Sequence, residues 1–270
     1  GLSCLLAYEG TPNEYKYDYG HKNIYYRGDE GEIFRSGDIE GMTPFKLFES
    51  LKQYDSMAYP HHPAALWGLV SAATDWDFHD SEIQRLVEIF SRHANFEDFE
   101  STSEYTKNIG KLEGHSVQDA LARKYRIGFT AGSDSHQMEH GIEGGIFAVF
   151  AREFTRESIY DAMYDRFTCA TTGARILASL KIGTAHMGQE ISVYADEPVL
   201  LDVSVLGTGK GRVQLIKNNQ VLSERETGDG CCDFSYRDAQ WRQDDCYYVR
   251  VVQEDGHMAW TSPIWVDEAL

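Results

Sequence analysis

The chain has few cysteines: 5 among its 270 residues. Their number is odd, they are dispersed, and none forms a C-x-x-C pair, which argues against both a disulfide framework and a cysteine zinc site. Free thiols favour a reducing, cytoplasmic compartment. The cysteines are Cys4, Cys169, Cys231, Cys232 and Cys246.

Long apolar runs and a leader are also missing. No run of eighteen apolar residues is present, and no charged segment followed by an apolar one precedes a small-residue cleavage site, so nothing in the sequence predicts a membrane span or a secretion signal. The chain starts at Gly1 rather than Met, and an apolar run at residues 2–8 follows directly. We therefore expect further sequence upstream of residue 1.

Positive charge is scarce, with 25 Lys and Arg against 43 Asp and Glu, a formal net charge of -18. Such a chain repels nucleic-acid backbones and anionic membrane surfaces, so neither is an expected partner. An anionic substrate would need local positive charge. A bound divalent cation supplies such charge economically, because it is often the largest charge in its site.

The order of apolar segments predicts two parts. A hydrophobic content of 42% allows a substantial core. Up to residue 176, apolar runs alternate with helical patterns, which predicts an α/β sheet or barrel. Residues 177–270 show period-two runs separated by turns, with Asn218 and Asn219 as a tight hairpin turn, which predicts an all-β domain. The expected helices are 43–54, 116–124 and 158–166, and the expected strands of the first part include 2–8, 23–26, 127–131 and 145–150.

Eight of the ten histidines lie in the first 140 residues, so the chemistry is expected in the first part. The sharpest signal is Gly-Ser-Asp-Ser-His directly after the strand at 127–131, because loops at strand ends build active sites in α/β folds. Asp134 and His136 can converge on one cation, and mixed oxygen and nitrogen ligands suit zinc, manganese or iron. The alternative is that Asp134 caps a turn and His136 is a surface residue.

A second signal is Tyr-Pro-His-His-Pro at residues 59–63. Adjacent side chains on an extended backbone point in opposite directions, so both histidines are not expected on one ion. His62, which precedes a proline, is the expected ligand. His61 is assigned a substrate-facing or structural role.

Three further residues follow strands or turns. His93 comes after the apolar run 86–90 and is a candidate ligand, or else a buried polar group. Glu9 ends an apolar run and is a candidate ligand, although a surface glutamate is the more common case. His21 follows Gly20. It is expected either to contact the substrate at the opening of the site formed by these ligands or to be an ordinary loop residue.

Together these segments resemble the PHP (polymerase and histidinol phosphatase) superfamily, in which ligands come from successive strand ends. The matching residues are Glu9, His62, His93 and Asp134 with His136, and the resemblance covers nearly the whole chain, including residues 20–23, 61–64, 87–89, 132–136 and 170–175. It implies that residues 1–176 form a partial, distorted β/α barrel and that residues 177–270 form a small sandwich-like β-domain. The opening His-x-His motif of that superfamily has no counterpart before Glu9, so the ligand set is expected to be incomplete and the activity of this chain stays open.

The resemblance implies a metal-dependent phosphoesterase acting on a small phosphorylated substrate through metal-activated water, with no side-chain nucleophile. Arg175 could clamp the phosphate, or it could join the two domains structurally.

Two other functions remain open. His136, Glu139 and His140 match the H-x-x-E-H pattern of inverted zinc metallopeptidases, although no apolar helix surrounds them. A noncatalytic binding protein is the second alternative. Trp241, Trp260 and Trp265 could then form a binding platform, but tryptophans in a small sandwich are more often core residues.

Overall fold

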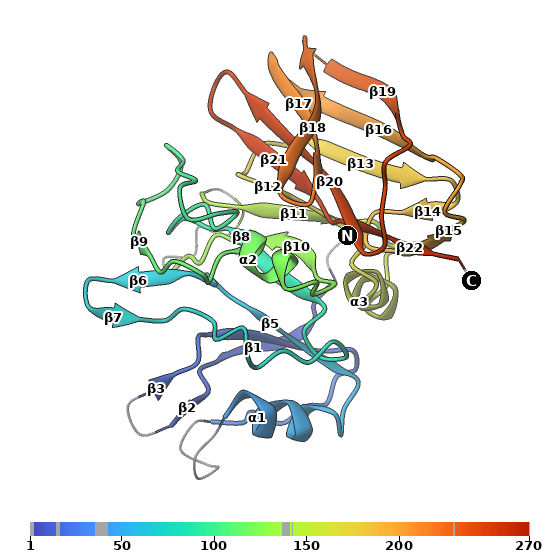
Figure 1. The fold of residues 1–270 in the computed structure, drawn as a ribbon. Helices are drawn as coiled ribbons and strands as arrows, with labels where there is room; N and C mark the ends of the chain where they lie inside the picture. The colour runs from blue at the N-terminus through green and yellow to red at the C-terminus, as the bar shows by residue number, and fades with distance from the viewer. Residues whose placement is uncertain are drawn as a thin grey trace.

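A computed structural model describes residues 3–14, 17–35, 43–136, 141, 143–228 and 230–269. The architecture is mostly β, with 42% strand and 9% helix. Figure 1 shows the C-terminal sheets at the top and the N-terminal strands with the first helix at the bottom. None of the described helices is long and apolar enough to cross a membrane.

Small sheets make up the first part of the chain. The antiparallel sheet β1-β4-β5 consists of β1 (Leu6–Gly10), β4 (Lys22–Tyr26) and β5 (Ser56–Pro60). Strands β8 (Leu86–Phe90) and β10 (Gly128–Ala131) form a parallel pair. The remaining short strands are β2 (Asn13–Glu14), β3 (Tyr17–Asp18), β6 (Ala65–Trp67), β7 (Val70–Ser71) and β9 (Gly110–Lys111).

The C-terminal part contains two larger sheets that share one hydrophobic core. The eight-stranded sheet contains β11 (Ile146–Val149), β12 (Thr168–Thr171), β15 (Glu190–Val193), β17 (Gly211–Lys217), β18 (Gln220–Thr227), β20 (Asp245–Gln253), β21 (Met258–Thr261) and β22 (Ile264–Glu268). The four-stranded sheet contains β13 (Leu177–Ile182), β14 (Ala185–His186), β16 (Val199–Thr208) and β19 (Gly230–Asp238). Buried and exposed residues alternate along β13 and β16, as one-sided packing requires.

The three described helices begin at side-chain caps. Thr43, Ser116 and Thr155 each accept a hydrogen bond from a backbone N–H of the first turn. The helices are α1 (Pro44–Leu51), α2 (Val117–Ala122) and α3 (Arg156–Tyr164). The expected helices at 43–54, 116–124 and 158–166 are thus confirmed: the first two are shorter than expected, and the third begins and ends two residues earlier. The expected Asn218–Asn219 turn also forms, with φ of 48° and 66°.

The expected α/β class with a partial β/α barrel is wrong. The strands were expected correctly at 23–26, 127–131 and 145–150, but helices do not cover them as a barrel would require. The connection from β5 to β8 holds the β6–β7 hairpin and turns, and the connection from β8 to β10 holds β9 and the six residues of α2. Apolar strand patterns separated by polar segments do not distinguish a helix crossover from a structured loop. In addition, β11 and β12 precede residue 176 but belong to the eight-stranded sheet of the C-terminal part.

Glu97 joins the first part of the chain to the eight-stranded sheet. Its side chain is fully buried and accepts hydrogen bonds from Tyr248 Oη at 2.7 Å and Arg250 Nη1 at 3.0 Å. Its other oxygen accepts from Trp260 Nε1 at 2.9 Å. Trp260 and Trp265 are buried, so these two tryptophans are core residues and not a binding platform.

Replacing Glu97 with Gln should lower the free energy of unfolding by about 1–3 kcal/mol, because an amide nitrogen would face buried donors that the carboxylate now satisfies. Urea unfolding followed by tryptophan fluorescence measures the change. The matched control is Glu100→Gln at an exposed position, which should stay within about 0.5 kcal/mol of the wild type. Equal stability of the two variants would contradict the role of Glu97.

Candidate metal centre

The ends of β1, β5, β8 and β10 bring carboxylates and imidazoles together. Glu9 lies in β1, His61 and His62 follow β5, His93 follows β8, and Asp134 follows β10. Strands β8 and β10 are parallel, so the segments that follow them leave the pair at the same edge. The group comprises Glu9, His21, His61, His62, Glu88, His93 and Asp134.

Glu88 is the residue that sequence reasoning missed as part of the site. It is 2% exposed in the middle of β8. Its Oε2 lies 2.9 Å from His61 Nδ1, and its Oε1 accepts the backbone N–H of His62 at 3.1 Å. The available signal was one glutamate inside the apolar strand 86–90, because a charge buried in a core strand needs a partner.

Asp134 contacts the ring nitrogen of His61 that faces away from Glu88. His61 Nε2 lies 3.4 Å from Asp134 Oδ2, and His93 Nε2 contacts the same oxygen. Burial alone would raise the pKa of Asp134, but the contacts with His61 and His93 hold this pKa well below its ordinary value. Burial lowers the pKa of His61, yet the carboxylates of Glu88 and Asp134 outweigh it and raise that pKa to about 10.

His61 and His62 face the same site, so the expectation that the adjacent side chains diverge is wrong. Their ring centroids are 4.2 Å apart. The physical reason is that His62 has φ of 36°, so the backbone is not extended there. One ligand atom each from His61, His62 and Asp134 lies within 4.8 Å of the others.

The backbone at two of these residues adopts a conformation that side chains rarely take. His62 has φ of 36° and Asp134 has φ of 46°, both in the left-handed region. Such conformations are costly and cluster at functional sites, where the surrounding structure holds them. Two of the three converging ligands thus have a left-handed backbone, which also occurs at turns elsewhere in the chain, such as Asn218 and Asn219.

A second group of possible ligands shares His62. Ligand atoms of Glu9, His21 and His62 also lie within 4.8 Å of one another. His21 Nδ1 is 2.7 Å from Glu9 Oε1, and this hydrogen bond lowers the pKa of Glu9. The buried Lys22 holds the preceding turn, because its Nζ donates to Tyr19 O at 3.0 Å and Gly20 O at 3.3 Å.

Two buried ring nitrogens find no hydrogen-bond partner in the described parts of the chain. They are His62 Nδ1 and His93 Nδ1. Burial, reinforced by nearby His61 and His21, lowers the pKa of His62 to about 2, so its ring is neutral. A neutral imidazole with a free nitrogen is the form that binds a metal ion.

Trp67 covers one side of the histidines. Its ring centroid lies 4.8 Å from that of His62 and 5.6 Å from that of His93. An aromatic wall restricts water and lowers the local dielectric, which strengthens electrostatic interactions inside the site.

Not all of the residues expected at the site lie within it. His136 is exposed and is absent from both described ligand groups. Arg175 is exposed on the connection between β12 and β13. Glu139 and His140, which the peptidase hypothesis requires, lie outside the described residues.

Gly132 packs against Glu88, and a Cβ atom at this position would lie 2.8 Å from Glu88 Oε2. Gly132→Ala should therefore displace the Glu88 carboxylate and lower the free energy of unfolding by about 1–3 kcal/mol. Urea unfolding measures this loss, and NMR of the His61 ring reports the displacement. The control is Gly228→Ala, where an added Cβ meets nothing within 4 Å. An unchanged His61 signal in Gly132→Ala would contradict the packing argument.

Part of the chain is similar to a sequence family. Residues 97–193 match a family described as "Protein of unknown function (DUF3604)". An uncharacterized protein of Chlamydia trachomatis is 31% identical over 71% of this chain and 35% of its own length, and one of Chlamydia muridarum is 29% identical over 82% of this chain and 40% of its own length. The chain thus spans about two fifths of the length of these relatives.

Solved structures resemble the chain only weakly. The fibronectin(III)-like modules of Clostridium thermocellum CbhA match 34% of this chain and 99% of that chain at 16% identity, with a TM-score of 0.22. An engineered protein matches 35% of this chain and 20% of that chain at 14% identity, with a TM-score of 0.21.

The resemblance to the PHP superfamily is wrong. The family found is DUF3604, and the described residues form several β-sheets with no β/α barrel among them. The matched motifs were short segments of three to six residues, and motifs of this length do not by themselves fix the fold around them.

Proposed function

We propose that this chain carries the metal centre of a metal-dependent hydrolase, a phosphoesterase that acts through metal-activated water. The observation that supports the proposal is the convergence of His61, His62 and Asp134, with ligand atoms within 4.8 Å of one another. The buried nitrogens of His62 and His93 that lack partners among the described residues add to it. Two imidazoles and a carboxylate suit zinc, manganese or iron.

Glu88 acts as the positioning residue of this centre. In metal sites, a ligating histidine commonly bonds a carboxylate through its other ring nitrogen, which fixes the orientation of the ring. Glu88 holds His61 Nδ1 in this way, so Nε2 is the nitrogen directed at Asp134. Its second oxygen fixes the His62 backbone, so one side chain orients both histidines.

Glu9 and His21 extend the centre on the other side of His62. They offer a second, more exposed set of ligand atoms, in which Glu9 is exposed and His62 is buried. A single cation could exchange between the two sets, or two cations could bind, since His62 belongs to both. The proposal requires only the buried set.

A phosphoester is the substrate class that a divalent cation at this centre would suit. A divalent cation lowers the pKa of a coordinated water and neutralises charge on a phosphoryl oxygen. The chain has a formal net charge of -18, so an anionic substrate needs such a local cation. Trp67 and the buried histidines would limit the access of bulk water to the reacting group.

The purified chain should contain zinc, manganese or iron at a near-stoichiometric level, because the buried ligand atoms form a site before the metal binds. His61→Ala with Asp134→Ala should abolish this metal content and any release of phosphate from p-nitrophenyl phosphate. Elemental analysis of protein prepared without a histidine tag measures it. The matched control is His186→Ala with Asp233→Ala on the C-terminal sheets, which should keep the metal.

His136→Ala, tested alone, determines whether the exposed His136 contributes. Retained metal in this variant is the expected result, because His136 lies outside the described ligand groups. A wild-type protein without metal, even after dialysis against zinc and manganese, would overturn the proposal.

Glu88→Gln should weaken metal binding about 10–100-fold, as loss of an outer-shell carboxylate does at other metal sites. The amide keeps the size of the side chain, so the fold should persist. Competition with a fluorescent zinc chelator measures the affinity. Glu100→Gln, an exposed change of the same kind, is the control and should leave the affinity unchanged.

A further inference from the structure

We infer that a hollow beside the metal centre, lined by Arg92, Lys107 and His257, binds an oxyanion, the phosphate or carboxylate group of the substrate. The hollow has a volume of about 580 Å³. Its role as a substrate site rests on the proposed function, whereas oxyanion binding itself can be tested without the metal.

The hollow adjoins the centre on two sides. Arg92 directly precedes His93 in the chain, and Gly144 packs against Ser133, the residue before Asp134. A Cβ at Gly144 would lie 2.8 Å from Ser133 Cα, so this wall touches the Asp134 loop. A group bound in the hollow therefore lies next to the side chains that hold the cation.

Arg92 and Lys107 supply local positive charge in a chain whose formal net charge is -18. The backbones of Arg92 and Lys107 are held together, because Lys107 N donates to Arg92 O at 2.8 Å. Neither side chain forms an ion pair within the described ranges. Glu104 and Glu143 also line the hollow, but both are exposed and screened by water, whereas Arg92 is half-buried. An arginine and a lysine that no described carboxylate pairs with suit an oxyanion.

His257 also lines the hollow, and its ring is held in place. Its ring stacks on Tyr105 with centroids 3.9 Å apart and an interplanar angle of 6°. Thr172 Oγ1 lies 2.9 Å from His257 Nδ1 and accepts the backbone N–H of Met258 at 3.0 Å. When the Thr172 hydroxyl donates to Nδ1, the neutral imidazole carries its hydrogen on Nε2, which is then a donor for a bound anion.

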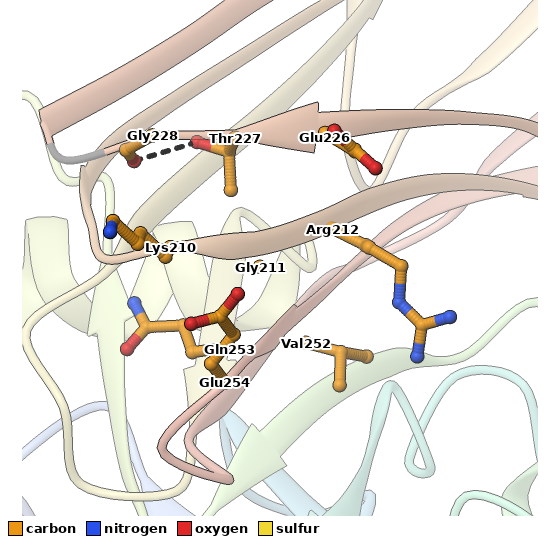
Figure 2. A pocket seen from close by; sticks show the side chains of 9 residues that line it. All are labelled: Lys210, Gly211, Arg212, Glu226, Thr227, Gly228, Val252, Gln253 and Glu254. Carbon is orange, nitrogen blue, oxygen red and sulfur yellow. Dashed lines mark hydrogen bonds between the residues drawn. The ribbon is translucent and has the colours of Figure 1, made fainter.

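Another hollow provides a matched control. It has a volume of about 640 Å³, is lined by Lys210 and Arg212, and contains none of the candidate metal ligands. Figure 2 shows these two side chains with Gln253 and Glu254 around the ends of β17, β18 and β20. It thus offers one lysine and one arginine beside acidic residues, but no lining histidine.

The test is isothermal titration of metal-free, EDTA-treated protein with inorganic phosphate and, in a second arm, with succinate. Arg92→Gln with Lys107→Gln should weaken anion binding at least about tenfold, because charge-assisted hydrogen bonds are lost. Lys210→Gln with Arg212→Gln changes the net charge equally and should alter the affinity less than about twofold. Urea unfolding checks that both double variants remain folded.

The outcomes separate the two proposals. Binding of phosphate or succinate that only the Arg92 and Lys107 variant loses supports the inference, and the preferred anion identifies the phosphate or carboxylate source. No binding of either anion by the wild type, or equal loss in both double variants, overturns it. If the EDTA-treated protein binds the anion, but the untreated wild type takes up no metal even after dialysis against zinc and manganese, the anion site stands and only the metal-dependent function is overturned.

Discussion

The buried carboxylate of Glu88 is the constraint on which the candidate site depends. A charge in the middle of a fully buried strand is tolerated only when hydrogen bonds replace its water. Here the bonds come from the His61 ring and the His62 backbone, and Gly132 leaves room for the carboxylate. Satisfying one buried charge therefore fixes the positions of both histidines at the end of β5.

The same rule explains how the C-terminal sheets attach to the first part of the chain. Glu97 is also fully buried, and its partners Tyr248, Arg250 and Trp260 all come from β20 and β21. Both carboxylates lie on one stretch that begins with β8, the strand that Figure 1 shows between the N-terminal sheet and the C-terminal sheets. This stretch links the candidate centre to the β-rich part through hydrogen-bonded charge rather than through apolar contact alone.

Sequence signals predicted correctly those features, such as helix caps and hairpin turns, that depend on residues close together in the chain. Helix α1 was expected from Thr43 and Pro44, and the Asn218–Asn219 turn from its residue types, because caps and turns depend on neighbours in the chain. The barrel was not predictable in this way. Whether a polar connection becomes a helix or a looped hairpin such as β6–β7 depends on what packs against it. The family resemblance predicted the wrong fold for the same reason, because its short motifs do not specify how the connections between strands pack.

The sequence by itself determined which residues carry polar chemistry at strand ends, since Glu9, His62, His93 and Asp134 could be picked out from their positions after apolar runs. Only the tertiary structure decided which of them meet. It brought His61 into the centre through the left-handed backbone at His62, added Glu88, and left His136 exposed. The physical reason is that convergence depends on backbone conformation and on long-range pairing of buried charges, and neither is encoded by spacing along the chain.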